Sequence, residues 1–154
     1  MDSGSTKKIA LISIHPEFVG KISNGIKRVE FRKRTSDDVI FFFVYATAPI
    51  QKIVGFFEVK EIHRDSPKSI WNKFFNVAGI DSKRYFEYYS GCDEAVAIEI
   101  KKFYKFEYDF DIKDLVGFKT PPQSYAFVPR GDLPRIKKEI NKSNRLIKEV
   151  VASF

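Results

Sequence analysis

The sequence has little of the chemistry that binds metals or forms covalent cross-links. Its 154 residues include one cysteine, Cys92, and two histidines, His15 and His63. A single cysteine excludes an intramolecular disulfide and a zinc site built from several cysteines. The two histidines are too few and too far apart in sequence to suggest a metal centre. We therefore expect neither a metal nor another cofactor.

Long apolar runs are also missing. None reaches the roughly 20 residues that a membrane-spanning helix needs. The N-terminus also lacks the apolar segment of a signal peptide. These absences predict no membrane partner and a cytoplasmic, reducing environment. Residues 1–7 are mostly small and polar, and we expect them to be flexible.

Acidic residues are fewer than basic ones. The 20 Asp and Glu residues stand against 27 Lys and Arg residues, which gives a net charge of +7. This balance favours an anionic partner, such as nucleic acid or a phosphorylated ligand. Apolar residues make up 44% of the chain, and its length suits one domain with its own core. We place that domain at residues 8–154.

The most informative stretch is residues 15–34. Pro16 suits the first turn of a helix, and apolar residues follow at helical spacing until Gly25, where a left-handed cap would end it. After Lys27 the period changes to two, which predicts a strand with Val29 and Phe31 on its buried face. The opposite face carries the charged residues of this strand: Arg28, Glu30, Arg32 and Arg34.

The charge of this stretch is unusual for an ordinary solvated strand. From Lys21 to Arg34 there are six basic residues and one acid, Glu30, so the local charge is +5. Such a face is either solvated or a site for an anion. A single carboxylate among cations favours the second reading, with Glu30 as a positioned acceptor.

The pattern Gly25-x-Lys27-x-x-Glu30-x-Arg32, after a helix that follows residues 13–16, resembles the signature of the ASCH domain family. Residues 45–49 and 53–59 resemble the family's next two strands, and residues 121–125 resemble its closing segment. The resemblance covers roughly residues 8–129. It implies a small β-barrel related to PUA domains.

The remaining elements follow from periodicity and turn residues. We expect further strands at 8–14, 39–47, 53–62 and 94–110, with bulges near Gly55 and near residues 101–102. Prolines bound residues 121–129, whose core should be a short edge strand or an extended loop. Short helices are predicted before Gly79 and before Gly91, and an amphipathic C-terminal helix at 133–153.

Several strands with short inserted helices, and no regular strand–helix alternation, argue for a closed or nearly closed small barrel. The predicted fold class is therefore α+β, mainly β. In the terms that the resemblance supplies, it is a small PUA-like mixed β-barrel with short inserted helices and a C-terminal amphipathic helix.

In such a barrel the charged strand and the proline-bounded segment would line one cleft beside the first helix. Four cations could bind phosphates there: Lys21, Lys27, Arg32 and Arg34. The closing segment would add two hydrogen-bonding side chains and a stacking ring: Gln123, Ser124 and Tyr125. Proteins of related fold bind RNA, so the resemblance implies an RNA or nucleotide ligand.

A second reading is catalytic. Some ASCH proteins resemble hydrolases that deacylate a modified cytidine or cut RNA. In the amidohydrolase pattern, a threonine follows the motif lysine by three residues, where this sequence has Glu30. Glu30 could instead activate water while Lys27 stabilises an oxyanion, and Ser124 is a further candidate catalytic residue.

Four readings without a catalytic or nucleic-acid-binding role also stay open from the sequence. Lys27 and Glu30 could form a plain ion pair, and the chain could act through protein interactions, including a homodimer. His15 is expected to help cap the first helix. His63 is expected to lie on the surface.

Overall fold

The computed structural model describes residues 8–115 and 117–140. Residues 1–7, where we predicted a flexible N-terminus, lie outside these ranges. So does the end of the predicted C-terminal helix, residues 141–154.

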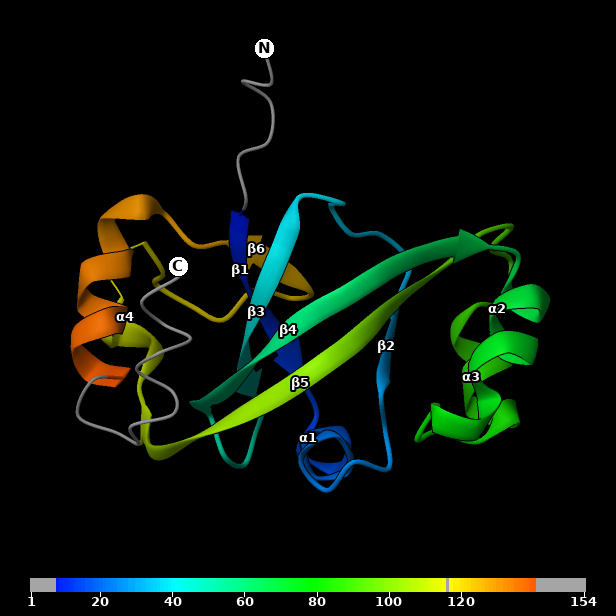
Figure 1. Cartoon of the computed structure of the whole chain (residues 1–154), viewed down its shortest axis with the longest axis horizontal. Coiled ribbons are helices and arrows are strands. Elements are labelled where there is room, and N and C mark those ends of the chain that lie inside the picture. Colours follow the sequence, from blue (N-terminus) through cyan, green and yellow to red (C-terminus); the bar gives the residue numbers. More distant parts are fainter. Residues whose placement is uncertain (1–7, 116, 141–154) are drawn as a thin grey trace, which may run out of the picture.

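A mixed β-sheet forms the body of the described chain (Figure 1). Its strands are β1 (Lys8–Ile14), β2 (Val29–Arg32), β3 (Val39–Ala46), β4 (Lys52–Asp65), β5 (Ala95–Phe110) and β6 (Tyr125–Phe127). Their order in the sheet is β2-β5-β4-β3-β1-β6, with β1 and β3 parallel and the other pairs antiparallel. The sheet curls into a half-barrel whose edges are β2 and β6. The predicted mainly β fold is confirmed, and the sheet is a half-barrel rather than a closed barrel.

Short helices cover both ends of this sheet. They are α1 (Pro16–Ser23), α2 (Pro67–Phe74), α3 (Ser82–Tyr88) and α4 (Leu133–Ile140), with 3-10 turns at 75–77, 112–114 and 130–132. In Figure 1, α2 and α3 lie together at one end of the long β4–β5 hairpin, and α4 lies at the other end. Among the described residues, no helix is both long enough and apolar enough to span a membrane.

The sequence of β3 is apolar at almost every position instead of alternating between apolar and polar residues. Phe41 and Phe43 pack into a cluster that α4 covers through Ile136. Phe42, between them, points to the opposite face of the sheet, where Ile22 of α1 joins the core. Because both faces of β3 are covered, every position along most of the strand can be apolar.

Two predicted irregularities in the β4–β5 hairpin are confirmed. A Cβ atom at Gly55 would lie 2.4 Å from the carbonyl oxygen of Tyr104, so only glycine lets β5 approach this closely. Further along, Glu58 pairs with Lys102 and Val59 with Ile100, which leaves Lys101 as the bulge residue.

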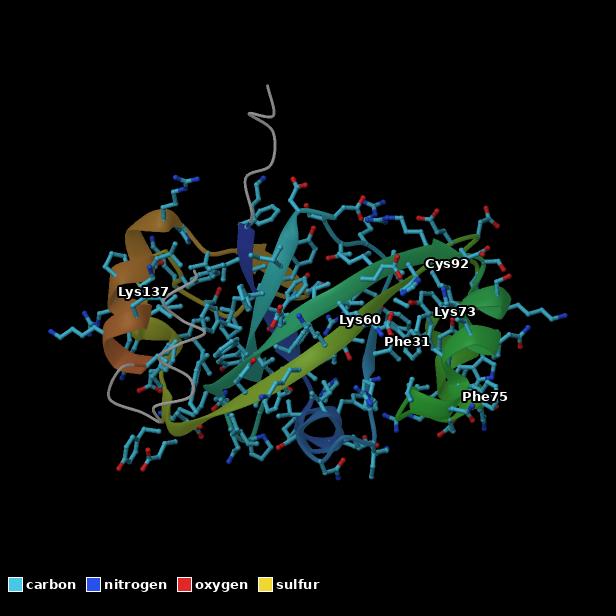
Figure 2. The ribbon with its side chains drawn as sticks, in the orientation of Figure 1. Phe31, Lys60, Lys73, Phe75, Cys92 and Lys137 are labelled. Atoms are coloured by element: carbon cyan, nitrogen blue, oxygen red, sulfur yellow. The ribbon has the colours of Figure 1, made fainter. Side chains whose placement is uncertain are left out.

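The charged strand β2 pairs with β5 at one edge of the sheet. Val29 and Phe31 are buried and Arg28 is exposed, as the period of two predicted. Phe31 makes an edge-to-face contact with Tyr85 of α3, with ring centroids 4.8 Å apart. Figure 2 shows Phe31 between the sheet and the α2–α3 pair. Phe31 and Tyr85 belong to a third core cluster, separate from the two on the faces of β3. This cluster packs α3 against β2, beside the pocket.

Candidate functional site

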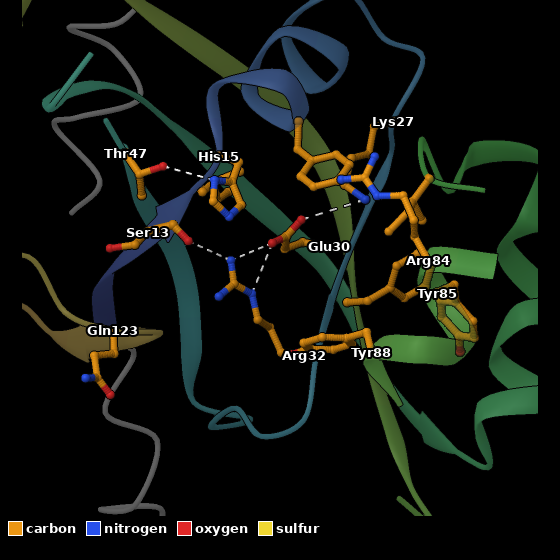
Figure 3. Close-up of a pocket in the computed structure, with 14 residues that line it drawn as sticks. Ser13, His15, Lys27, Glu30, Arg32, Thr47, Arg84, Tyr85, Tyr88 and Gln123 are labelled. Atoms are coloured by element: carbon orange, nitrogen blue, oxygen red, sulfur yellow. Dashed lines mark hydrogen bonds and ion pairs between the residues drawn. The ribbon is translucent and has the colours of Figure 1, made fainter. Parts of the chain in front are cut away.

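A pocket of about 500 Å³ opens where the two edges of the half-barrel approach each other. Its lining comes from β2, the end of β1, α1, α3 and the loops before β4 and β6. The residues are Ser13, Ile14, His15, Phe18, Lys27, Glu30, Phe31, Arg32, Thr47, Ile80, Arg84, Tyr85, Tyr88 and Gln123 (Figure 3). Segments far apart in sequence therefore meet in one concave site.

Arg32 joins the two edges of the sheet. Its Nη2 donates to the carbonyl oxygen of Ser13 at 2.8 Å, and its Nη1 donates to Oγ of Ser124 at 3.4 Å. Its Nε and Nη2 both donate to Oε2 of Glu30, at 3.0 and 2.5 Å. Charge-assisted bonds of this kind are roughly twice as strong as neutral ones. In the described part of the chain β2 and β6 are the edges of the sheet and do not pair with each other, so the Arg32 side chain links β2 to β1 and to the loop before β6.

Lys27 is buried on the α3 side of the pocket, with 3% of its surface exposed. Its Nζ donates to the carbonyl oxygen of Ala78 at 2.6 Å. The rings of Phe18 and Phe31 flank the ammonium group, with centroids 5.1 and 5.0 Å from Nζ. Burial lowers the pKa of Lys27 from its ordinary value, and the nearby Glu30 carboxylate opposes that shift in part.

The Lys27 side chain lies against a glycine. A Cβ atom at Gly79 would come within 2.6 Å of Lys27 Cβ and 2.8 Å of Lys27 Cγ. Gly79 also has a φ of +65°, a conformation that other residues adopt at a cost. The stem of Lys27 therefore packs directly against the backbone of Gly79, where a larger residue would not fit.

Glu30 lies in the middle of the charged group, between Lys27 and Arg32 (Figure 3). Its side chain is 8% exposed. Oε2 takes both hydrogen bonds from Arg32, whereas Oε1 is 3.8 Å from Lys27 Nζ, beyond hydrogen-bond distance. The predicted plain ion pair is therefore part of a three-residue group that faces a pocket.

Aromatic and apolar side chains form the walls around this group. Of the residues that form the walls, Phe31 and Tyr85 are buried, Phe18 and Ile80 are half-buried, and Tyr88 is 41% exposed. Burial raises the pKa of the Tyr88 hydroxyl. Flat apolar walls around a few polar groups are typical of small-molecule sites.

An ion pair between two helices forms part of the rim. Arg84 of α3 donates to Glu17 of α1, with its shortest N–O distance at 3.0 Å. The guanidinium also lies 5.1 Å from the centroid of the Phe18 ring. The hydrogen bond from Arg84 lowers the pKa of Glu17. Both side chains are half-exposed, so the pair can exchange partners with an incoming ligand.

The structure does not bear out the capping role predicted for His15. It occupies the N-cap position of α1, but its side chain makes no capping hydrogen bond. Nδ1 of its ring instead lies 3.3 Å from the hydroxyl of Thr47, on the turn between β3 and β4. The carbonyl oxygen of His15 does accept bonds from the first turn of the helix. His15 is thereby a pocket residue.

The predicted site residues divide into three groups. Lys27, Glu30, Arg32 and Gln123 line the pocket. Ser124 adjoins it through its hydrogen bond to Arg32. Three others lie outside the lining: Lys21, Arg34 and Tyr125.

Each residue outside the lining has a different environment. Lys21 donates to the carbonyl oxygen of Gly79 at 3.0 Å and pairs with Glu17 of the same helix. Arg34 is exposed. Tyr125 packs edge-on against Phe42, with ring centroids 6.2 Å apart, so it serves the core.

Most of the residues that form the walls of the pocket were not predicted from the sequence. Tyr85 and Tyr88 belong to an aromatic cluster that the sequence pattern could not divide between core and site. In the structure Tyr85 is buried, with its hydroxyl donating to the carbonyl oxygen of Pro67, while Tyr88 reaches the pocket rim. Arg84 carried no local signal, because its role depends on Glu17, 67 residues earlier.

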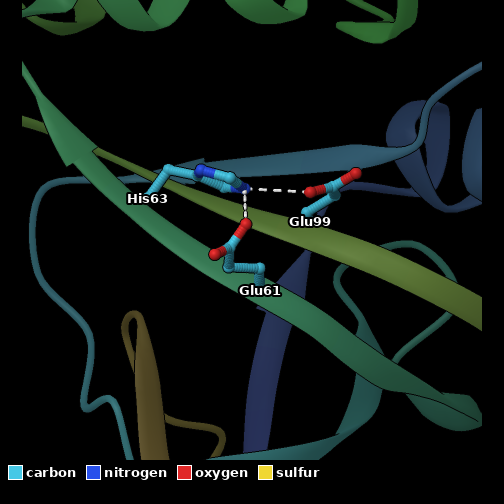
Figure 4. Close-up of side chains that lie close together, drawn as sticks. All are labelled: Glu61, His63 and Glu99. Atoms are coloured by element: carbon cyan, nitrogen blue, oxygen red, sulfur yellow. Dashed lines mark hydrogen bonds and ion pairs between the residues drawn. The ribbon is translucent and has the colours of Figure 1, made fainter.

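His63 is not a surface residue, contrary to the prediction. Its side chain is 11% exposed, and Nε2 lies 2.9 Å from Glu99 and 3.2 Å from Glu61 (Figure 4). The three donor atoms lie within 4.8 Å of one another, a spacing that a metal ion could use. Lys73 Nζ, however, lies 3.1 Å from the other ring nitrogen, and Lys60 pairs with Glu99.

These lysines change the chemistry of the cluster. An ammonium group can only donate, so Nδ1 accepts from Lys73 and the ring proton lies on Nε2. Nε2 then donates to the carboxylates and has no lone pair for a metal. In this arrangement the cluster is an ion-pair network outside the pocket.

The comparisons with known proteins agree with the motif. The model of the ASCH domain matches residues 12–106. An ASCH domain-containing ribonuclease of Zymomonas mobilis is 26% identical, over 84% of this chain and 90% of that protein. The crystal structure of ASCH from Zymomonas mobilis superposes with a TM-score of 0.80, covering 90% of this chain and 97% of that one at 24% identity. The predicted PUA-like α+β fold is thereby confirmed.

A different relative carries a similar segment within a longer protein. The large ribosomal subunit protein uL22 of Ureaplasma parvum is 32% identical over 75% of this chain, which spans 38% of that protein.

Because the model of the ASCH domain matches residues 12–106, more than half of the sequence, the chain belongs to the ASCH domain family.

Proposed function

We propose that this chain binds RNA, or a nucleotide, by taking one nucleotide into the pocket between β2 and β6. The observation that carries the proposal is one cavity that combines aromatic walls with Lys27, Glu30 and Arg32. Its volume of about 500 Å³ falls in the range of ligand pockets, about 300–1,000 Å³. Unstacked RNA bases are commonly held by aromatic stacking and hydrogen bonds to their edges. The name of the Zymomonas relative, a ribonuclease, supports RNA as the ligand.

The cations of the site fall into two groups. Inside the pocket, Arg32 is bonded to Glu30 and Ser13, and Lys27 is bonded to Ala78. Phosphate contacts fall to exposed cations, of which Lys33 stands over the Tyr88 ring at the rim, 4.9 Å from its centroid. Each phosphate contact supplies affinity that does not depend on base sequence and weakens with salt.

A titration of short single-stranded RNA at several salt concentrations tests this division. Lys33→Ala should weaken binding and reduce the salt slope by about one unit. Arg32→Lys keeps the charge but loses the planar fork, so it should weaken binding and leave the slope unchanged. Lys102→Ala, an exposed lysine beside Tyr104, is the control of equal charge. Undetectable binding at low salt, or equal losses for Lys33→Ala and Lys102→Ala, would reject the proposal.

A second candidate function is RNA or nucleoside hydrolysis at the same site. The specific observation is a buried lysine with a lowered pKa, 3.8 Å from a carboxylate oxygen that faces the pocket. Glu30 would act as the general base on water, and Lys27 would stabilise the developing negative charge. Incubation with RNA or an acylated nucleoside should then yield product, and Glu30→Gln should lower the rate about 10²-fold. Binding without product in the wild type rejects this second function.

A further inference from the structure

We infer that the pocket receives an unpaired base, with its Watson–Crick edge turned toward Glu30 and Lys27. The inference rests on the proposed nucleotide ligand and specifies which part of that ligand is read.

The first observation is an acceptor left unused. Among the described residues, Oε1 of Glu30 accepts no hydrogen bond, although its side chain is 8% exposed and lines the pocket. Oε1 is not sealed in the core: it is open to the pocket, so it is free to accept a hydrogen bond from a molecule that enters there. Arg32 does not occupy this oxygen, since both of its bonds to Glu30 go to Oε2.

The second observation is that Lys27 cannot close the gap. Its Nζ is held by the Ala78 carbonyl at 2.6 Å, and Phe18 and Phe31 flank it. The stem of the same side chain packs against the backbone of Gly79. Lys27 Nζ lies 3.8 Å from Oε1, beyond hydrogen-bond distance, so a donor on the ligand can bond to this oxygen.

The third observation is that donor and acceptor stand side by side. An ammonium group has three N–H donors, and in the described chain the side chain of Lys27 donates only to Ala78. A remaining N–H of Lys27 beside the free oxygen of Glu30 matches an acceptor beside an N–H on the ligand. Every standard base presents that pair on its Watson–Crick edge, whether as a carbonyl with a ring N–H or as a ring nitrogen with an amino group. Proteins that extract a base from a stack read it at this edge.

Charge and shape set the direction of entry. Inside the pocket, Lys27 is bonded to Ala78 and Arg32 to Glu30 and Ser13, whereas Lys33 and Arg84 are exposed at the rim, where a phosphate can reach them. The walls of Phe18, Phe31 and Tyr88 suit a flat ring. The base therefore enters first and the phosphate stays outside. A base already paired in a duplex cannot present its edge, so the substrate class is single-stranded RNA or free nucleotide.

Calorimetric titration with modified nucleotides tests the inference on the intact protein. The four nucleoside monophosphates are compared with analogues whose bases stay uncharged but carry methyl groups in place of the N–H that would bond to Glu30. These are the monophosphates of 3-methyluridine, 1-methylguanosine, N4,N4-dimethylcytidine and N6,N6-dimethyladenosine. For each nucleotide that binds, loss of the donor should lower the affinity at least about tenfold, the scale for a hydrogen bond to a charged group. The 5-methyl analogues of uridine and cytidine add the same group on the opposite edge and should leave the affinity within about threefold.

The outcomes separate this inference from the proposed function. If none of the four nucleotides and no single-stranded RNA binds, the proposed function itself is wrong. If nucleotides bind but the donor-blocked and 5-methyl analogues behave alike, the edge is not read and the inference is overturned. A second arm anneals a complementary strand to a bound RNA. Undiminished affinity for that duplex overturns the inference as well.

Discussion

Replacing Gly79 with alanine should damage both the stability of the fold and the pocket, because the new methyl group would overlap the stem of Lys27. The added Cβ would lie 2.6 Å from Lys27 Cβ and 2.8 Å from Cγ, far inside van der Waals contact. Lys27 has little room to move, since its ammonium group is bonded to Ala78 and flanked by two rings.

Two costs add in this substitution. The φ of +65° at Gly79 penalises any residue with a Cβ by about 1–2 kcal/mol. Forcing an extra methyl group into a packed site costs about 1–3 kcal/mol more. Gly91→Ala isolates the first cost, because Gly91 has a φ of +79° and nothing lies within 4 Å of its added Cβ.

Urea unfolding of the wild type and both variants measures the difference. At an m-value of about 2 kcal/mol/M, an extra loss of about 2 kcal/mol in Gly79→Ala lowers the midpoint by about 1 M relative to Gly91→Ala. Nucleotide affinity should fall in Gly79→Ala and stay near wild type in Gly91→Ala. Equal losses of stability in the two variants would refute the contact with Lys27.

Two further predictions concern charge. Burial lowers the pKa of Lys27 below 10.5 in the folded chain, so the unfolded chain binds more protons between those two values. The free energy of unfolding of the wild type should therefore rise with pH across that window relative to Lys27→Met, and parallel urea midpoints from pH 7 to 10 would contradict it. Glu17→Gln releases Arg84 from its ion pair at the rim. It should tighten binding of a nucleoside monophosphate severalfold at low salt but leave the affinity for the nucleoside unchanged, and calorimetry that shows equal changes for both ligands would refute this.

Much of the fold could be predicted from the sequence, because local patterns carry it. The continuous apolar run of β3, the glycine after α1 and the prolines around β6 each mark an element within a few residues. Strand β4 is longer than predicted. Its last three residues, His63 to Asp65, are polar, and they stay in the sheet through pairing with residues 95–97 of β5. Pairing between residues thirty or more positions apart leaves no trace in a local period.

The candidate site was predictable in its charged centre and not in its walls. Lys27, Glu30 and Arg32 lie within six residues, so a period of two and a charge count suffice to group them. The walls come from α1, α3 and the loop before β6, and their meeting depends on how the half-barrel curls. Lys21 shows the limit of a charge count: it counted toward the basic cluster, yet it donates to the Gly79 carbonyl and pairs with Glu17.

Glu30 is the residue on which the two proposed functions, nucleotide binding and hydrolysis, both depend. A carboxylate that is 8% exposed would be costly without partners, and Arg32 satisfies only one of its oxygens. The stability of the fold would be served as well by a group that Arg32 and Lys27 saturate completely. Lys27 is instead held 3.8 Å away by Ala78 and Gly79, which keeps the second oxygen available to whatever enters the pocket. A base edge as that partner corresponds to the proposed nucleotide binding, and a water molecule corresponds to the proposed hydrolysis.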